Sequence, residues 1–214
     1  MCDDYAAKNP KIKVLHTENG GVSSARNKGI QAASGLYLVF LDGDDFFTNN
    51  DSLKNLYAVI QQIKLPVVFN CVLTSVSSGE KDVKVFNKVP KDVVKIKSEA
   101  FGGKFRGALF CTPWAISVER SFLLRNKILF KEGIIHEDEL FVPLVICACK
   151  EVAVNNNPFY TYRTKREGSI MYNTTVKHIY DRFTVIEELL LKKDADVHGG
   201  GGGDLYCFDV TIFT

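Results

Sequence analysis

A continuous apolar run that ends in three carboxylates is the feature that most constrains how this chain folds. Residues 36–41 (LYLVFL) carry no charge, and Asp42, Asp44 and Asp45 follow at once around Gly43. An unbroken apolar run of this length is typical of a strand covered on both faces, as in a layered α/β protein. Ligands of open α/β sheets bind beyond the carboxyl ends of strands, so the pattern puts these acids at a ligand-binding position.

The spacing of the acids favours a divalent cation. Carboxylates at positions i and i+2 can converge on one hard cation, and a glycine between them lets the backbone turn tightly. The alternative is a capped turn, because Asp is common in loops and at helix starts. Three acids in four positions weaken that alternative, since they repel one another unless a cation or a proton intervenes. An EF-hand loop is excluded, because Phe46 and Phe47 stand where its oxygen ligands and glycine are required.

Strand-like and helix-like segments alternate along the chain, which predicts an α/β fold. Residues 12–16, 22–33 and 36–41 are expected to form a strand, a helix and a strand, that is, a βαβ unit. The further expectations are helices at 52–63, 98–106, 137–149 and 176–193, strands at 66–72 and 112–118, an antiparallel piece at 74–97, and two short strands around 155–158 within 151–163.

Composition excludes several classes of partner. The net charge is +2, from 27 basic and 25 acidic residues, so no global field attracts nucleic acid. No apolar stretch approaches the ~18–20 residues that span a bilayer, and the N-terminus lacks signal-peptide regions, so the cytoplasm is the expected compartment. The six cysteines follow no framework spacing, which predicts free and mostly buried thiols; Cys147 and Cys149 would point apart on a helix and are not a zinc pair.

A glycine-rich turn precedes the first predicted helix, in ENGGVSSARNKGI (18–30). It is neither a Walker A loop nor a G-x-G-x-x-G sequence, because the required glycines and lysine are absent. A helix N-terminus nevertheless offers free N–H groups to an anion, and Arg26 adds a charged donor. Taken alone, this is a weak signal for phosphate binding.

Three motifs in order give a more specific indication. NGGVSSARNKGI, SGLYLVFLDGDDFF and GIIHEDELF, at their separations within residues 1–170, resemble the family 2 glycosyltransferases of bacterial polysaccharide and lipopolysaccharide synthesis. The resemblance implies a GT-A-like α/β fold, a mixed sheet flanked by helices. It also implies an inverting transferase with a nucleotide-sugar donor and Mn²⁺ or Mg²⁺ at a D-x-D motif. Asp42 and Asp44 match that motif, Asp44 as the direct ligand and Asp42 as a ligand or a ribose contact.

The resemblance also assigns roles outside the acidic turn. Asp138, in the Glu137-Asp138 pair, is the expected general base, although charge at a helix N-terminus would also explain these acids. His136 is expected to be a neighbour and not a ligand. Trp114 is either an acceptor-side wall or a core residue, and the Arg163/Arg166 segment either closes over the diphosphate or is a solvated basic loop. The predicted donor-binding residues are Asn19, Gly20, Arg26, Asn27, Asp42 and Arg163.

The expected organisation is one domain over residues 1–194, with a nucleotide-binding part (1–73) and an acceptor-side part (74–194). The tail 195–214, with five consecutive glycines, is expected to be a flexible linker or an artefactual extension. Family members usually begin with a strand and a second strand that ends in an Asp-Asp-Gly-Ser-like turn. This chain begins after both, so the fold is expected to be N-terminally incomplete, with an exposed sheet edge open to self-association.

The predicted function is sugar transfer from a UDP-sugar to a glycan or lipid-linked acceptor in cell-surface polysaccharide synthesis, at the inner face of the membrane or in peripheral contact with it. Nucleic acid is not an expected partner. Two alternatives stand beside it: a degenerate, non-catalytic nucleotide-sugar-binding module, and a nucleotidyltransferase. The second of these requires a glycine-rich signature with a basic residue near an N-terminal strand, which the sequence lacks.

Overall fold

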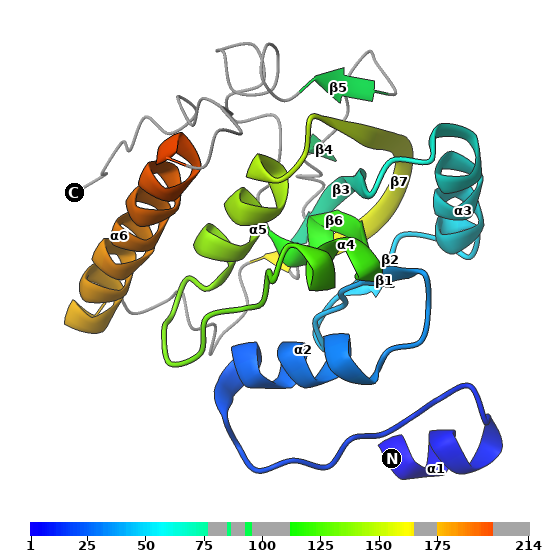
Figure 1. Ribbon diagram of the computed structural model, residues 1–214. Helices are drawn as coiled ribbons and strands as arrows, with labels where there is room; N and C mark the ends of the chain where they lie inside the picture. The colour runs from blue at the N-terminus through cyan, green and yellow to red at the C-terminus, as the bar shows by residue number, and fades with distance from the viewer. Residues whose placement is uncertain (77–84, 87–92, 96–111, 165–174, 199–214) are drawn as a thin grey trace.

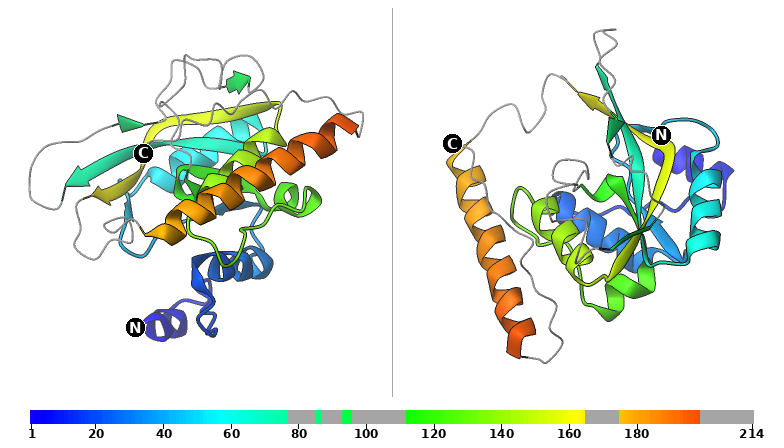
Figure 2. Two further views of the ribbon diagram at one scale, coloured as in Figure 1. Left: turned by 90° about the vertical axis from the view of Figure 1, so that its left-hand side faces the viewer. Right: turned by 90° about the horizontal axis from the view of Figure 1, so that it is seen from above.

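The computed structural model describes residues 1–76, 85–86, 93–95, 112–164 and 175–198. A mixed sheet lies between helix α3 on one face and helices α2, α4 and α5 on the other, with α6 packed outside α5 (Figures 1 and 2). The elements are α1 (Cys2–Lys8), α2 (Gly21–Ala32), β1 (Tyr37–Val39), β2 (Phe46–Phe47), α3 (Ser52–Ile63), β3 (Val67–Val76), β4 (Val85–Phe86), β5 (Val93–Lys95), the 3₁₀ helix η2 (Pro113–Ala115), β6 (Ile116–Glu119), α4 (Arg120–Arg125), α5 (Asp138–Cys147), β7 (Glu151–Thr164) and α6 (Val176–His198).

The sheet runs in the order β1-β6-β3-β7-β2, with β4 beside β3 and β5 beside β7. The long strands β3 and β7 pair in parallel, and every other described pair is antiparallel. Among the described strands, β1 has β6 as its single neighbour, so β1 forms one edge of the sheet. Self-association through such an edge stays a prediction.

Alternate residues of the central strands face two separate apolar clusters, as the two-residue period of a strand requires. On β3, Val67 and Phe69 pack toward α2, α4 and α5, while Val68 and Val72 pack toward α3. The clean split explains why these strands read as continuous apolar runs, because both faces of the sheet are covered.

The predicted strand at residues 12–16 is wrong, and so is the βαβ unit that depended on it. This stretch is irregular, with Ile12 and Leu15 40% and 52% exposed, and no described strand pairs with it. An extended segment becomes a strand only where a neighbouring strand forms hydrogen bonds with its N–H and C=O groups. Apolar content alone does not supply such a partner strand. Strand β1 pairs antiparallel with β6 instead.

The two short strands predicted around Asn155–Pro158 are one strand, β7. Its register against β3 shifts twice, so that Asn155, Pro158 and Tyr160 lie opposite three consecutive residues, 70–72. A bulge thus absorbs the extra residues and tolerates a proline without breaking the strand. Sequence punctuation by Asn and Pro could not distinguish this bulge from a turn.

The remaining expectations fare better. Helices α2, α3 and α5 and strand β3 lie where the spacing predicted them, and α6 continues to His198, five residues past its predicted end. The extended stretch at 112–118 begins with η2 before β6. In the 74–97 piece, β4 and β5 are antiparallel as expected. The predicted helix 98–106 and the tail from 199 lie outside the described residues.

Candidate active site

Arg26 joins the two acidic motifs of the sequence. From the second turn of α2, its guanidinium donates to Asp42 Oδ1 at 3.0 Å and to Glu137 Oε1 at 2.6 Å. It also lies over the Phe130 ring, 5.2 Å from the centroid. The Arg26 side chain is only 13% exposed, so both ion pairs form in partly desolvated surroundings where they are stronger than surface pairs. The Arg26 guanidinium therefore holds the acidic turn against the start of α5.

Asp138 is the first residue of α5, directly after the Arg26-bound Glu137. Burial, followed by the neighbouring charges of Glu137 and Glu139, raises the pKa of Asp138 from 3.8 to about 6. The Glu139 N–H donates to its carboxylate at 2.9 Å, and that bond together with Arg26 offsets part of the rise. A carboxyl group with a pKa near neutrality can accept and release a proton under ordinary conditions, which is what a general base requires.

The buried member of the acidic turn is Asp45, which is 9% exposed. Its carboxylate accepts a hydrogen bond from the Tyr160 hydroxyl at 2.7 Å and another from the Arg163 N–H at 2.9 Å, both on β7. The Tyr160 oxygen in turn accepts the Asp42 N–H at 3.3 Å. Burial raises the pKa of Asp45, and these two hydrogen bonds counteract the rise. Asp45 therefore fastens the turn to the sheet.

Asp42 and Asp44 are left nearer to solvent, Asp42 partly exposed and Asp44 exposed. A side chain at Gly43 would meet nothing within 4 Å, so the turn has open space beside it. Among the described residues, no group of three or more His, Cys, Asp or Glu side chains could enclose a metal ion. The donor set fits an ion that two carboxylates hold together with substrate phosphates and water, as Mg²⁺ often is, and does not fit an all-protein cage.

Three of the predicted donor-binding residues, Asn19, Gly20 and Asn27, lie just before or within α2 and have structural roles there. Asn19 Oδ1 accepts the Gly21 N–H at 3.2 Å, and Gly21 has φ +78°, which favours glycine. A Cβ on Gly20 would come within 2.9 Å of the Ser24 side chain, so the start of α2 is closely packed. The Asn27 amide exchanges two 2.9 Å hydrogen bonds with the Phe130 backbone. Asn27 thus has a clear structural task, and donor binding by all three predicted residues stays a prediction.

The structure decides between the two alternatives for Trp114 but not between those for the Arg163/Arg166 segment. Trp114 is 5% exposed and stacks between Tyr160 and Tyr162, with centroids 4.8 and 5.1 Å away, so it is a core residue of the α3 side. Arg163 is exposed, and its guanidinium lies over the Phe46 ring at 5.3 Å. Arg166 lies outside the described residues.

His136 is buried two residues before the start of α5. Its Nδ1 lies 3.3 Å from Glu139 Oε1, and burial lowers the pKa of the ring, which disfavours its charged form. His178 contacts His136, and Tyr160 contacts Asp42 and Asp45 of the acidic turn; neither residue was singled out from the sequence. Tyr160 comes from a strand 115 residues beyond Asp45, and no local pattern indicates such a pairing.

The chain belongs to Glycosyl transferase family 2, whose family model matches residues 1–125, more than half of the chain. Curated relatives include a cholesterol galactosyltransferase of Borreliella burgdorferi, 27% identical over 91% of this chain and 56% of the relative. The glycosyltransferase GlyG of Streptococcus pneumoniae is 30% identical over 80% of this chain and 58% of its own length. The chain thus spans somewhat more than half the length of these relatives.

The fold is similar to that of a Staphylococcus aureus TarS fragment crystallised with UDP-GlcNAc. The TM-score is 0.64 at 23% identity, over 88% of this chain and 52% of the TarS chain. This likeness, together with the mixed sheet flanked by helices, shows a GT-A fold. Separately, none of the helices in the described ranges is both long enough and apolar enough to cross a bilayer.

Proposed function

We propose that this chain forms an inverting glycosyltransferase domain that moves a sugar from a UDP-sugar to a hydroxyl group of a glycan or lipid-linked acceptor in cell-surface polysaccharide synthesis. The observation that carries the proposal is the Arg26 bridge, which brings the acidic turn at Asp42 and the start of α5 at Glu137 into one site. An acidic turn suited to a cation and a carboxyl group suited to proton transfer are the two parts that such a reaction needs.

In this reaction Asp42 and Asp44 would hold Mn²⁺ or Mg²⁺. The ion, when bound, neutralises negative charge on the departing diphosphate. Asp138 accepts the proton of the acceptor hydroxyl while the hydroxyl oxygen forms a bond to the anomeric carbon. The bond between that carbon and UDP breaks on the opposite face, so the configuration inverts. Glu137 stays paired with Arg26, and its charge helps keep the pKa of Asp138 high enough for proton transfer.

The relatives support the sugar donor. The TarS fragment was crystallised with UDP-GlcNAc, and the relative from Borreliella burgdorferi is named a galactosyltransferase. A panel of UDP-, GDP- and ADP-sugars should therefore be tested for Mn²⁺-dependent binding by calorimetry and for release of the nucleotide by hydrolysis. We expect a UDP-sugar to bind with the metal and to be hydrolysed slowly, with water as the acceptor. Failure of every nucleotide sugar to bind would refute the proposal, and binding without hydrolysis or transfer would favour the non-catalytic module.

A further inference from the structure

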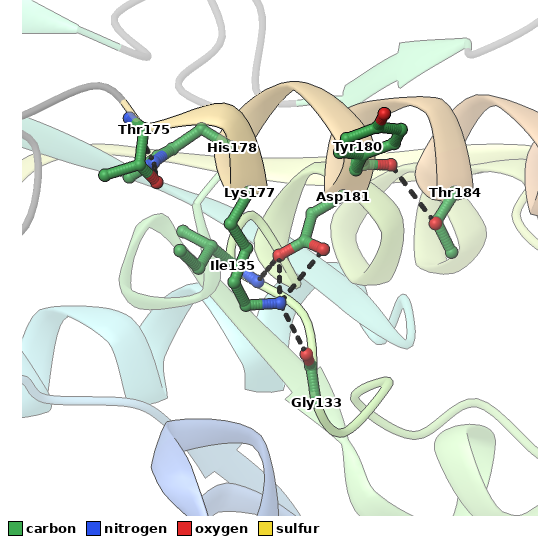
Figure 3. Close-up of polar contacts among 8 residues, drawn as sticks. All are labelled: Gly133, Ile135, Thr175, Lys177, His178, Tyr180, Asp181 and Thr184. Atoms are coloured by element: carbon green, nitrogen blue, oxygen red, sulfur yellow. Dashed lines mark hydrogen bonds and ion pairs between the residues drawn. The ribbon is translucent and has the colours of Figure 1, made fainter.

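Helix α6 is fastened to the loop that leads into α5. Lys177 Nζ donates to the Gly133 carbonyl at 3.0 Å, and Asp181 accepts the Ile135 N–H at 2.7 Å (Figure 3). Lys177 and Asp181, one turn apart on α6, also form an ion pair at 2.8 Å. Asp181 is 7% exposed, so its contacts with Lys177 and with the Ile135 N–H form away from solvent.

Further contacts continue along the same side of α6. Arg182 donates twice to Glu139, at 3.1 and 3.3 Å, and Lys131 forms an ion pair with Glu188. The rings of His136 and His178 meet edge to face, with centroids 5.3 Å apart. Residues 131–139 are therefore held by α6 at five positions.

The loop has a backbone that depends on such support. Gly133 has φ +83° and His136 has φ +69°. A left-handed conformation is disfavoured for a residue with a Cβ and persists only where its surroundings hold it. His136 directly precedes Glu137 and Asp138, so relaxation of His136 would change the direction from which Asp138 enters the site.

We propose that Lys177 and Asp181 are positioning residues for proton transfer, fixing the backbone of residues 133–136 so that Asp138 faces the acceptor. The inference rests on the proposed function, because it assumes that Asp138 takes the proton. Neither side chain has to touch the substrate. The pair acts through the loop backbone, by way of the Gly133 carbonyl and the Ile135 N–H.

A purely structural role predicts a different result. The Lys177 side chain is 53% exposed, and exposed ion pairs contribute little to stability. Lys177→Met should therefore leave the protein folded. Displacement of a catalytic group by about 1 Å, in contrast, can reduce a rate by about 10²-fold. A large loss of rate without a loss of stability is the signature of positioning.

The test compares Lys177→Met, Asp181→Asn and the conservative Lys177→Arg with Thr184→Ala as a matched control. Thr184 lies on the same helix, and among the described residues its hydroxyl donates to the Tyr180 carbonyl of α6 itself (Figure 3). Hydrolysis of the UDP-sugar selected from the panel gives kcat, calorimetry gives the affinity for UDP with Mn²⁺, and hydrogen exchange reports on residues 133–138 of the free protein.

For Lys177→Met and Asp181→Asn we expect kcat to fall by about 10- to 100-fold, UDP affinity to stay within about threefold, and exchange of the loop amides to accelerate. Lys177→Arg and Thr184→Ala should remain within about threefold of wild type in all three measurements. An unchanged kcat in folded Lys177→Met, or unchanged loop exchange, would overturn the inference even if Asp181→Asn fails to fold. A wild-type protein that hydrolyses no UDP-sugar would instead count against the proposed function, while hydrogen exchange still reports on the loop.

Discussion

The acidic turn (residues 42–45) and the acidic helix start (residues 137–139) each carry three carboxylates, yet the two groups differ in burial and in their charged partners. In the turn, one acid is buried and hydrogen-bonded to β7, and the other two lie nearer to solvent, Asp42 being partly exposed and paired with Arg26. At the helix start, Glu137 is paired with Arg26, and Asp138 is half-buried between two further acids with a pKa raised to about 6.

The difference teaches that the surroundings, and not the composition, select the chemistry of an acidic cluster. Carboxylates that face solvent on a tight turn keep their charge available for a hard cation. A carboxyl group crowded by other acids and removed from water holds its proton more tightly, which suits proton transfer. The following predictions test whether the two clusters are divided in this way.

The largest expected effect is on turnover in Asp138→Asn. The amide keeps the size of the carboxyl group but cannot act as a base, so turnover should fall by about 10²- to 10⁴-fold, with donor affinity changed by less than about threefold. Initial rates and calorimetry on the same preparation would measure both. Asp51→Asn is the control, since it makes the same change at an exposed carboxylate at the start of α3, where no side-chain cap hydrogen bond forms. Near wild-type transfer by folded Asp138→Asn would move the base to Glu137 or Glu139.

The next effect is on metal-dependent binding in Asp44→Ala. Loss of a carboxylate from the turn should weaken UDP binding in the presence of Mn²⁺ by about 10²-fold, because a bound ion is worth several kcal/mol at a diphosphate. The fold should be unaffected, since Asp44 is exposed. Asp51→Ala removes the same charge from the exposed start of α3, where no side-chain cap hydrogen bond forms, and should bind UDP as wild type does. Equal affinities of the two variants would refute the D-x-D assignment.

The smallest effect is on stability as a function of pH. The folded-state pKa of Asp138 is raised from 3.8 to about 6, so the folded state binds more protons than the unfolded state between these values. Stability from this group is present below about pH 4 and is lost as the pH rises through about 6. Asp138→Asn should therefore be more stable than wild type by about 1–3 kcal/mol at pH 8, the upper figure corresponding to the full pKa difference. Partial exposure of Asp138 to solvent and its position at a helix N-terminus make the stability difference smaller than this upper figure.

Urea unfolding of wild type and Asp138→Asn at pH 4 and pH 8 would measure this difference. The two proteins should differ little at pH 4, where Asp138 is protonated in the folded state and about half protonated in the unfolded state. A variant that is less stable than wild type at pH 8 would show that the carboxylate mainly serves the N-terminus of α5, and the distinction between the two acidic clusters would then fail.

The sequence alone determined the features that depend on neighbours in the chain. The helical spacing of residues 52–63, the apolar runs at 36–41 and 66–72, and the three ordered motifs are local patterns. Helix α3 and strand β3 appear in the structure where they were expected, whereas β1 spans only Tyr37–Val39 of the predicted 36–41, with Leu36 and Leu41 66% and 48% exposed. The resemblance that these motifs carry led to the right family and fold. The expectation for residues 12–16 failed because a strand also needs a partner, which no local pattern supplies.

Only the tertiary structure decided which acids share a site and which ion pairs and pKa shifts each of them has. Arg26 meets Asp42 and Glu137 across 16 and 111 residues, and Asp45 meets Tyr160 across 115. The attachment of α6 to the loop before α5 is of the same kind. The physical reason is that burial and charge proximity set a pKa and an ion pair, and both are properties of positions in space that chain neighbours do not specify.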